Sequence, residues 1–129
     1  MIGKVIKSLL DDSAALIALV PVDNMYPYVL NENTAMPAIV YTIDSYNVNY
    51  TKDGWAGDEC AFSVISISRD YANLQEIVSE IRAALEMQRG TIESIALQHI
   101  HMTSLAETYD NTSDLFANRL SFEVYITGY

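Results

Sequence analysis

Residues 38–69, AIVYTIDSYNVNYTKDGWAGDECAFSVISISR, decide the fold because two strand-like runs flank a glycine-marked tip. Both runs, over residues 38–47 and 59–69, are rich in the β-branched and aromatic residues that strands favour. The second run alternates, with Cys60, Phe62 and Val64 on one face and Ala61, Ser63 and Ile65 on the other. The sequence therefore predicts an antiparallel hairpin, joined by a long loop around Asp53 and Gly54.

The only tryptophan of the chain, Trp55, falls within this predicted loop. A large apolar ring at a loop tip has little core within reach, so it either folds back on its hairpin or docks into another subunit. Tyrosine and tryptophan are favoured at protein interfaces because they combine apolar area with a polar group. The sequence leaves both alternatives open. The candidate protein interface comprises Tyr50, Lys52, Asp53, Trp55 and Asp58.

Three helical segments are expected outside the hairpin. Apolar residues at helical spacing predict the first, and they are Ile2, Val5, Ile6, Leu9 and Leu10. Asp12 or Ser13 can cap a short second helix, which stops at Pro21. Asp70 caps the longest helix, and Gly90 is expected at its C-terminal end.

Further strands are predicted on both sides of the hairpin. Residues 25–28, MYPY, form a short edge segment because their proline cannot donate to a central ladder. A polar loop over residues 31–37 separates this segment from the hairpin. Two more strands are expected at about residues 94–105 and 117–127, and the apolar register of the first shifts near residues 98–99, which suggests a β-bulge.

Together these elements predict the α+β class. A chain of 129 residues is one domain by length, so we expect a single domain over residues 1–129. Its two layers would be an antiparallel sheet of about four main strands and a helical layer. One long helix and the N-terminal helix would pack on the sheet, and the β-hairpin would project from it.

Charge and composition exclude several classes of function. The net charge of −10 argues against DNA binding through phosphate neutralisation, which needs clustered lysines and arginines. The single cysteine, Cys60, cannot form an internal disulfide. No window approaches the ~20 uninterrupted apolar residues of a membrane span. We therefore expect a soluble chain with no membrane partner.

Candidate chemical groups are few. His99 and His101 lie two apart on a predicted strand and so point to the same side, but a third ligand at motif spacing is missing. Asp53, Asp58 and Glu59 do not follow the spacing of a calcium loop, and hydrated loop acids are the simpler interpretation. No nucleophile motif is present. The sequence predicts no enzyme, no cofactor and no metal site.

Segments along nearly the whole chain form an ordered set: AALIALV (14–20), MYPYVL (25–30), MPAIVYTI (36–43), YTKDGWAG (50–57), DYANLQEIVSEIRAALEMQRGT (70–91) and ETYDNTSDLFANRLSFEVYI (107–126). Through this set the chain resembles the tail-completion or tail-terminator proteins of long-tailed bacteriophages. The resemblance implies a homohexameric ring at the head-proximal end of the tail tube.

Such a ring would end tube polymerisation and provide the head-docking surface. The implied partners are copies of the chain itself, the tail-tube protein and a head-neck or connector protein, while DNA passes through the lumen without specific binding. The implied location is the virion, after assembly in the bacterial host cytoplasm. Two alternatives stay open: a head-completion or neck adaptor, and a non-viral α+β ligand-binding or regulatory domain.

Overall fold

The computed structural model describes residues 2–29 and 35–128, so most of the loop expected at 31–37 lies outside the described residues. The helices are α1 Ile2–Asp11, α2 Ala14–Leu19, the 3-10 turn η1 Val22–Asn24 and α3 Tyr71–Leu85. The strands are β1 Met25–Pro27, β2 Ala38–Thr51, β3 Gly54–Ser68, β4 Gly90–Ile92, β5 Ile95–Leu97, β6 His101–Asp110 and β7 Leu115–Gly128.

The protein is mostly sheet, with 51% of the described residues in strands and 28% in helices. Six strands follow the order β1-β2-β3-β7-β5-β4 and curl into a half-barrel. The seventh strand, β6, is not part of this order and pairs with β7. The prediction of a two-layer α+β domain with about four main strands and one long helix is therefore wrong. The prediction missed β4 and did not separate β5 from β6, because strands of three residues are too short to show a periodic pattern.

The central strands β2, β3 and β7 pair antiparallel in consecutive order. β1 joins the outer side of β2 in parallel, and its proline lies at the edge of the sheet, as predicted. The strand expected over residues 94–105 is two strands, β5 and β6, separated at residues 98–100. Both pair with β7, so the apolar shift near 98–99 marks a break between strands, and a smaller irregularity follows it between Met102 and Ser104.

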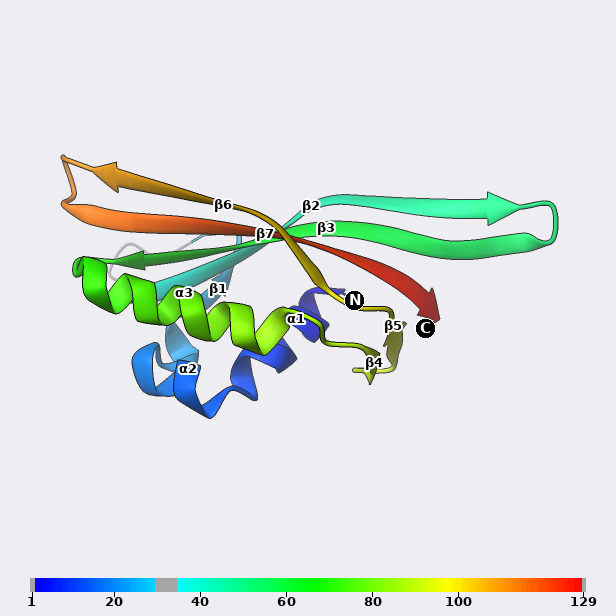
Figure 1. Ribbon diagram of the computed structural model, residues 1–129, viewed down its shortest axis with the longest axis horizontal. Helices are drawn as coiled ribbons and strands as arrows, with labels where there is room; N and C mark the ends of the chain where they lie inside the picture. Colours follow the sequence, from blue (N-terminus) through cyan, green and yellow to red (C-terminus); the bar gives the residue numbers. More distant parts are fainter. Residues whose placement is uncertain (1, 30–34, 129) are drawn as a thin grey trace.

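The helices cover one face of the sheet, as Figure 1 shows below the strands. All five apolar residues of the predicted α1 stripe are buried. Ser13 caps α2 by accepting from the Leu16 amide at 3.3 Å, and Asp70 caps α3 by accepting from the Ala72 amide at 3.1 Å. Gly90 does not end α3: Glu86 is its C-cap, Met87 takes the left-handed conformation at φ 65°, and Gly90 begins β4.

The core lies between this helical layer and the alternating faces of β3 and β7. The inward residues of β7 are all buried, as predicted: Leu120, Phe122, Val124 and Ile126. On β3, Cys60, Phe62 and Val64 face the same core. The rings of Phe62 and Phe122 stack with centroids 5.3 Å apart at the centre of the sheet.

No described helix combines the length and apolar character that crossing a membrane requires.

Candidate interface on the projecting arm

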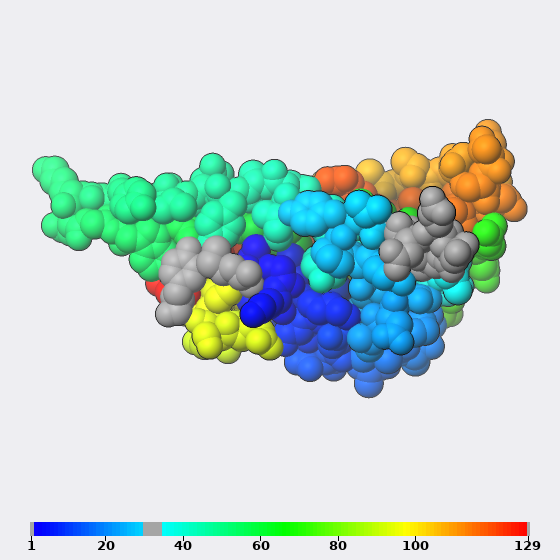
Figure 2. Space-filling view, turned by 180° about the vertical axis from the view of Figure 1, so that it is seen from behind, coloured from blue at the N-terminus to red at the C-terminus, as the bar shows by residue number. Residues whose placement is uncertain are grey.

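The distal halves of β2 and β3, residues 44–58, form an arm that extends beyond the helical layer (Figures 1 and 2). The strands continue to Thr51 and resume at Gly54, so only Lys52 and Asp53 lie between them. The predicted long loop is therefore wrong. Gly54 adopts a φ of 116°, which suits a tight connection of this kind, and such a connection lets the ladder run almost to the tip.

Trp55 lies in β3, opposite Tyr50 of β2, and not in a loop. Its indole Nε1 donates a hydrogen bond to Asp58 Oδ1 at 2.8 Å. The side chain nevertheless keeps 39% of its surface exposed. Both alternatives for this residue thus describe part of the observation, because the ring is fixed to its own hairpin and still presents apolar surface to solvent.

Asp58 is not the hydrated loop acid that its sequence neighbours suggested. It is fully buried and accepts a hydrogen bond from the Tyr46 hydroxyl at 2.6 Å as well as the bond from Trp55. Two donors from different strands meet at this one carboxyl group, so Asp58 holds the indole in one orientation. The three-residue spacing between Trp55 and Asp58 did not predict this contact, because the contact depends on how β2 and β3 pair near the tip of the arm.

The structure brings the five predicted interface residues onto one end of the molecule. Lys52 and Asp53 form the turn, Tyr50 and Trp55 pair next to it, and Asp58 accepts the hydrogen bond of the indole. Tyr50 is 74% exposed, and Val48, which the sequence analysis did not select, is 47% exposed. The arm thus carries three exposed large apolar side chains, a concentration that favours a contact surface.

The β3 strand of the arm is braced from β7. The Tyr125 hydroxyl donates to the carbonyl oxygen of Ala56. Gly57, beside it, adopts a φ of 109°, and a Cβ added there would lie 2.6 Å from the Tyr125 hydroxyl and 2.9 Å from the Ile126 carbonyl. Only glycine fits this conformation and this close approach without a shift of the backbone.

We predict that Gly57→Ala destabilises the protein by about 1–3 kcal/mol, because it adds a steric clash to an unfavourable φ. Gly54→Ala is the matched control, since Gly54 also has a positive φ but nothing lies within 4 Å of its added Cβ. Thermal unfolding of both variants measures the difference. Equal losses would show that Tyr125 does not restrict this position.

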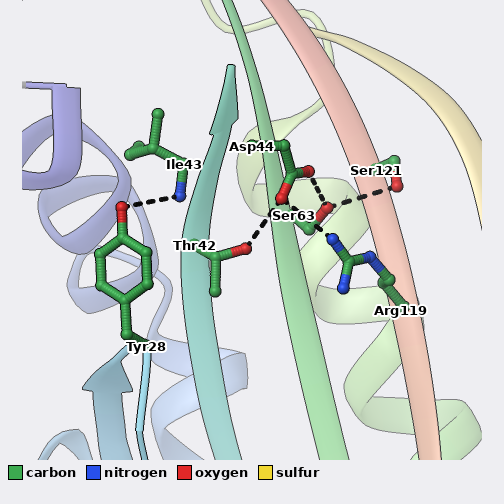
Figure 3. Close-up of polar contacts among 7 residues, drawn as sticks. All are labelled: Tyr28, Thr42, Ile43, Asp44, Ser63, Arg119 and Ser121. Carbon is green, nitrogen blue, oxygen red and sulfur yellow. Dashed lines mark hydrogen bonds and ion pairs between the residues drawn. The ribbon is translucent and has the colours of Figure 1, made fainter. Parts of the chain in front are cut away.

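A polar network ties three strands together where the arm leaves the sheet (Figure 3). Asp44 on β2 accepts from Thr42 at 3.1 Å and from Arg119 of β7 at 2.9 Å. The buried Ser63 of β3 also donates to Asp44. The Arg119–Asp44 ion pair is partly exposed, so its value lies in fixing the geometry rather than in stability.

Few groups suited to catalysis come together. Among residues 2–29 and 35–128, no three histidine, cysteine or acidic side chains are grouped as metal ligands. The rings of His99 and His101 lie 6.2 Å apart. Burial raises the pKa of the Cys60 thiol to about 11, which keeps it protonated and weakly nucleophilic at neutral pH.

A hollow of about 750 Å³ lies beside the base of the arm. Strand and connecting residues line it, including Glu59, Arg89, His101 and Glu123. The ligand-binding alternative expected a pocket between helix and sheet, and the hollow beside the arm is not of this kind because strand and connecting residues line it. A second hollow, of about 600 Å³, does lie between α1 and the strands β1 and β2, with Lys7, Pro27 and Tyr41 among its lining residues.

The fold and the arm define a strand-rich structural subunit with a braced, projecting hairpin. The model of the family Tail completion protein gp17 matches residues 4–127, and the chain belongs to this family. It is therefore a structural tail-completion protein of the phage virion.

Solved structures share the fold. A chain described as "Virion of native gene transfer agent (GTA) particle" is similar with a TM-score of 0.76 at 18% identity, over 95% of this chain and 92% of that one. A second, whose description states no function, has a TM-score of 0.63 at 10% identity, over 98% and 96%. No curated protein matches the sequence.

Proposed function

We propose that the protein closes with copies of itself into a homohexameric ring at the head-proximal end of the tail tube. The ring ends tube polymerisation and provides the surface on which the head-neck or connector protein docks. The observation that carries this proposal is the arm, which joins exposed apolar side chains to a rigid support. A ring of identical subunits needs two different surfaces that meet, and a projecting hairpin supplies one of them.

Within the arm, Trp55 is the proposed anchor and Tyr50 its flank, while Lys52 and Asp53 contact the partner from the turn. Asp58 positions the indole through its hydrogen bond. A side chain already held in its bound orientation loses less conformational entropy when a partner covers it, which strengthens binding. The contact is made with a neighbouring copy or with the tail-tube protein.

The acidity of the chain supports passage of DNA through the ring. With a net charge of −10, the subunit repels phosphate and offers no cluster of cations that would release counterions. We propose that DNA slides through the lumen without specific binding. Closure by shape needs no bond-making step, so the proposed role is non-enzymatic and uses no cofactor.

In this proposal the whole of residues 1–129 acts as one tail-terminator-like domain, assembled in the bacterial host cytoplasm. A head-completion or neck adaptor is the second candidate, because it would use the same projecting contact surface on a different partner. The two roles differ in what the isolated protein binds: a terminator binds the open end of a tube, and an adaptor binds the head.

The test mixes the purified protein with tail tubes that lack it and then adds free tube subunits. We expect electron microscopy to show a six-fold ring on one end of each tube and no further growth at that end. Tubes that keep growing at both ends would contradict the terminator role. Binding to tail-free heads and not to tubes would favour the neck adaptor.

A further inference from the structure

Two long strand edges have no strand neighbour among the described residues. The outer side of β6 is one, since β6 pairs only with β7. The outer side of β2 beyond Ile43 is the other. The pairing of β1 with β2 ends at Tyr41, and the Tyr28 hydroxyl accepts a hydrogen bond from the Ile43 amide. Residues 44–51 and 101–110 therefore present backbone groups that can pair with another chain.

These edges carry few of the features that usually block such pairing, apart from the register shifts of β2 between Ile43 and Ser45 and of β6 between Met102 and Ser104. Residues 44–51 contain one charged residue, Asp44, and residues 101–110 contain Glu107, Asp110 and the titratable His101. Neither edge contains proline or lysine, which natural proteins use to protect edge strands. By contrast, β1 covers the inner half of the β2 edge and itself ends in Pro27.

The two edges have complementary directions. β2, β3, β7 and β6 are neighbours in that order, and each pair is antiparallel. Three reversals make β6 antiparallel to β2. If β6 of one copy meets β2 of the next, the junction is antiparallel as well, so the alternating sheet continues across the subunit boundary without interruption.

The edges lie at opposite ends of the sheet. One row of paired residues crosses it: His101, Glu123, Ala61 and Ser45. The free edge of β2 extends to one side of this row and β6 to the other side, as the two hairpins do in Figure 1. Pairing the edges therefore requires that each copy be displaced along the strands relative to its neighbour.

A displacement of about six residues overlaps most of both edges and amounts to about 20 Å. The four strands of one copy span about 19 Å across the sheet. The strands would then tilt by about 45° to the ring axis, at the upper end of the tilt that closed barrels have. A sheet can close on itself only if its strands are shifted along one another, so this displacement between copies favours a closed ring.

The same displacement places exposed apolar side chains opposite each other. Val48 lies three rows from Ser45 on one side, and Leu105 lies three rows from His101 on the other. They are 47% and 44% exposed. Residues that pair directly across strands point to the same face of the sheet. Val48 pairs with Asp58, which pairs with Ile126 of β7, and Leu105 pairs with Leu120 of β7. Because both β7 residues face the core, Val48 and Leu105 point to the same face of the sheet.

We propose that the free edge of β2 in one copy pairs antiparallel with β6 of the next, with Val48 opposite Leu105. The ring is thereby closed by a continuous β-sheet. This inference rests on the proposed self-association and names the surfaces that carry it. Backbone hydrogen bonds supply the affinity, as in other cases of strand addition, and the paired apolar side chains set the register.

A disulfide tests the register. In Val48→Cys/Leu105→Cys, the two positions of one copy are separated by two intervening strands, about 14 Å across the sheet, and by six rows, about 20 Å along it. The thiols are therefore about 25 Å apart and cannot bond within that copy. Oxidation of the protein assembled on tail tubes should give a ladder of covalent oligomers on a non-reducing gel. Asn47→Cys/Leu105→Cys is the matched control, since Asn47 neighbours Val48 but points to the other face. Cys60 is retained in every variant because it is buried.

We expect at least ten times more covalent oligomer from the first pair than from the control. Equal yields, or no ladder from the first pair on tubes that do carry rings, would overturn the strand pairing and leave the proposed function standing. If the parent protein forms no ring on the tubes, the proposed function fails, and the inference fails with it. Circular dichroism of each variant confirms that the subunit is folded.

Discussion

Replacing Trp55 with alanine is expected to leave the monomer folded and to weaken binding to neighbouring copies or to the tube by about 2 kcal/mol or more. That loss corresponds to about a 30-fold weaker affinity. The physical reason is that the indole offers exposed apolar area in a fixed orientation, held by Asp58. Titration of fluorescently labelled protein onto purified tail tubes measures the affinity, and thermal unfolding checks the monomer.

Two further variants separate the contribution of the Trp55 indole from that of Asp58, which holds the indole in place. Trp55→Phe keeps an apolar ring but cannot donate to Asp58, so an intermediate loss of affinity is expected. Asp58→Asn keeps the size of the side chain but replaces one of the two accepting oxygens with a donor, which leaves the indole less firmly placed. If Trp55→Ala binds tubes as tightly as the parent protein, the tryptophan is part of the hairpin alone and the proposed anchor is wrong.

Phe62→Ala is expected to damage the fold itself, with a loss of about 3–5 kcal/mol in the free energy of unfolding. Phe62 is fully buried and stacks on Phe122, so alanine would leave a cavity between the sheet and the helical layer. Domains of this kind are stable by only about 5–15 kcal/mol, and the loss is therefore a large fraction. Denaturant unfolding of the purified protein provides the measurement.

Val48→Ala is the matched control for stability, since Val48 lies on the exposed arm and its truncation should change unfolding by no more than about 0.5 kcal/mol. A loss for Phe62→Ala similar to that of Val48→Ala would mean that the core does not depend on the stacked pair. Together, Phe62 and Trp55 separate folding from assembly, because one variant should unfold easily and the other should fold normally but assemble poorly.

Much of the fold was readable from the sequence because regular elements with one buried face leave a periodic pattern. The apolar stripe of α1, the caps at Ser13 and Asp70, and the alternation of β7 all have this origin. The three-residue strands β4 and β5 and the break at residues 98–100 left no such pattern, and the sheet was therefore predicted with too few strands.

The arm was harder to predict for a related reason. Most of its residues are at least partly exposed, so residues 48–57 show little hydrophobic alternation and resemble a loop in sequence. The buried environment of Asp58 depends on the cross-strand register near a bulge, which a single sequence does not reveal. The interface residues could be selected by residue type, but their mutual support required the structure.

The proposed role at the end of the tail is tested most directly by electron microscopy of particles assembled without this protein. If the chain closes on itself to cap the tube, tails should be longer than those of the parent phage, variable in length and detached from heads. Restoring the protein should return a single tail length and joined particles. Tails of normal length attached to heads in the absence of the protein would contradict the account.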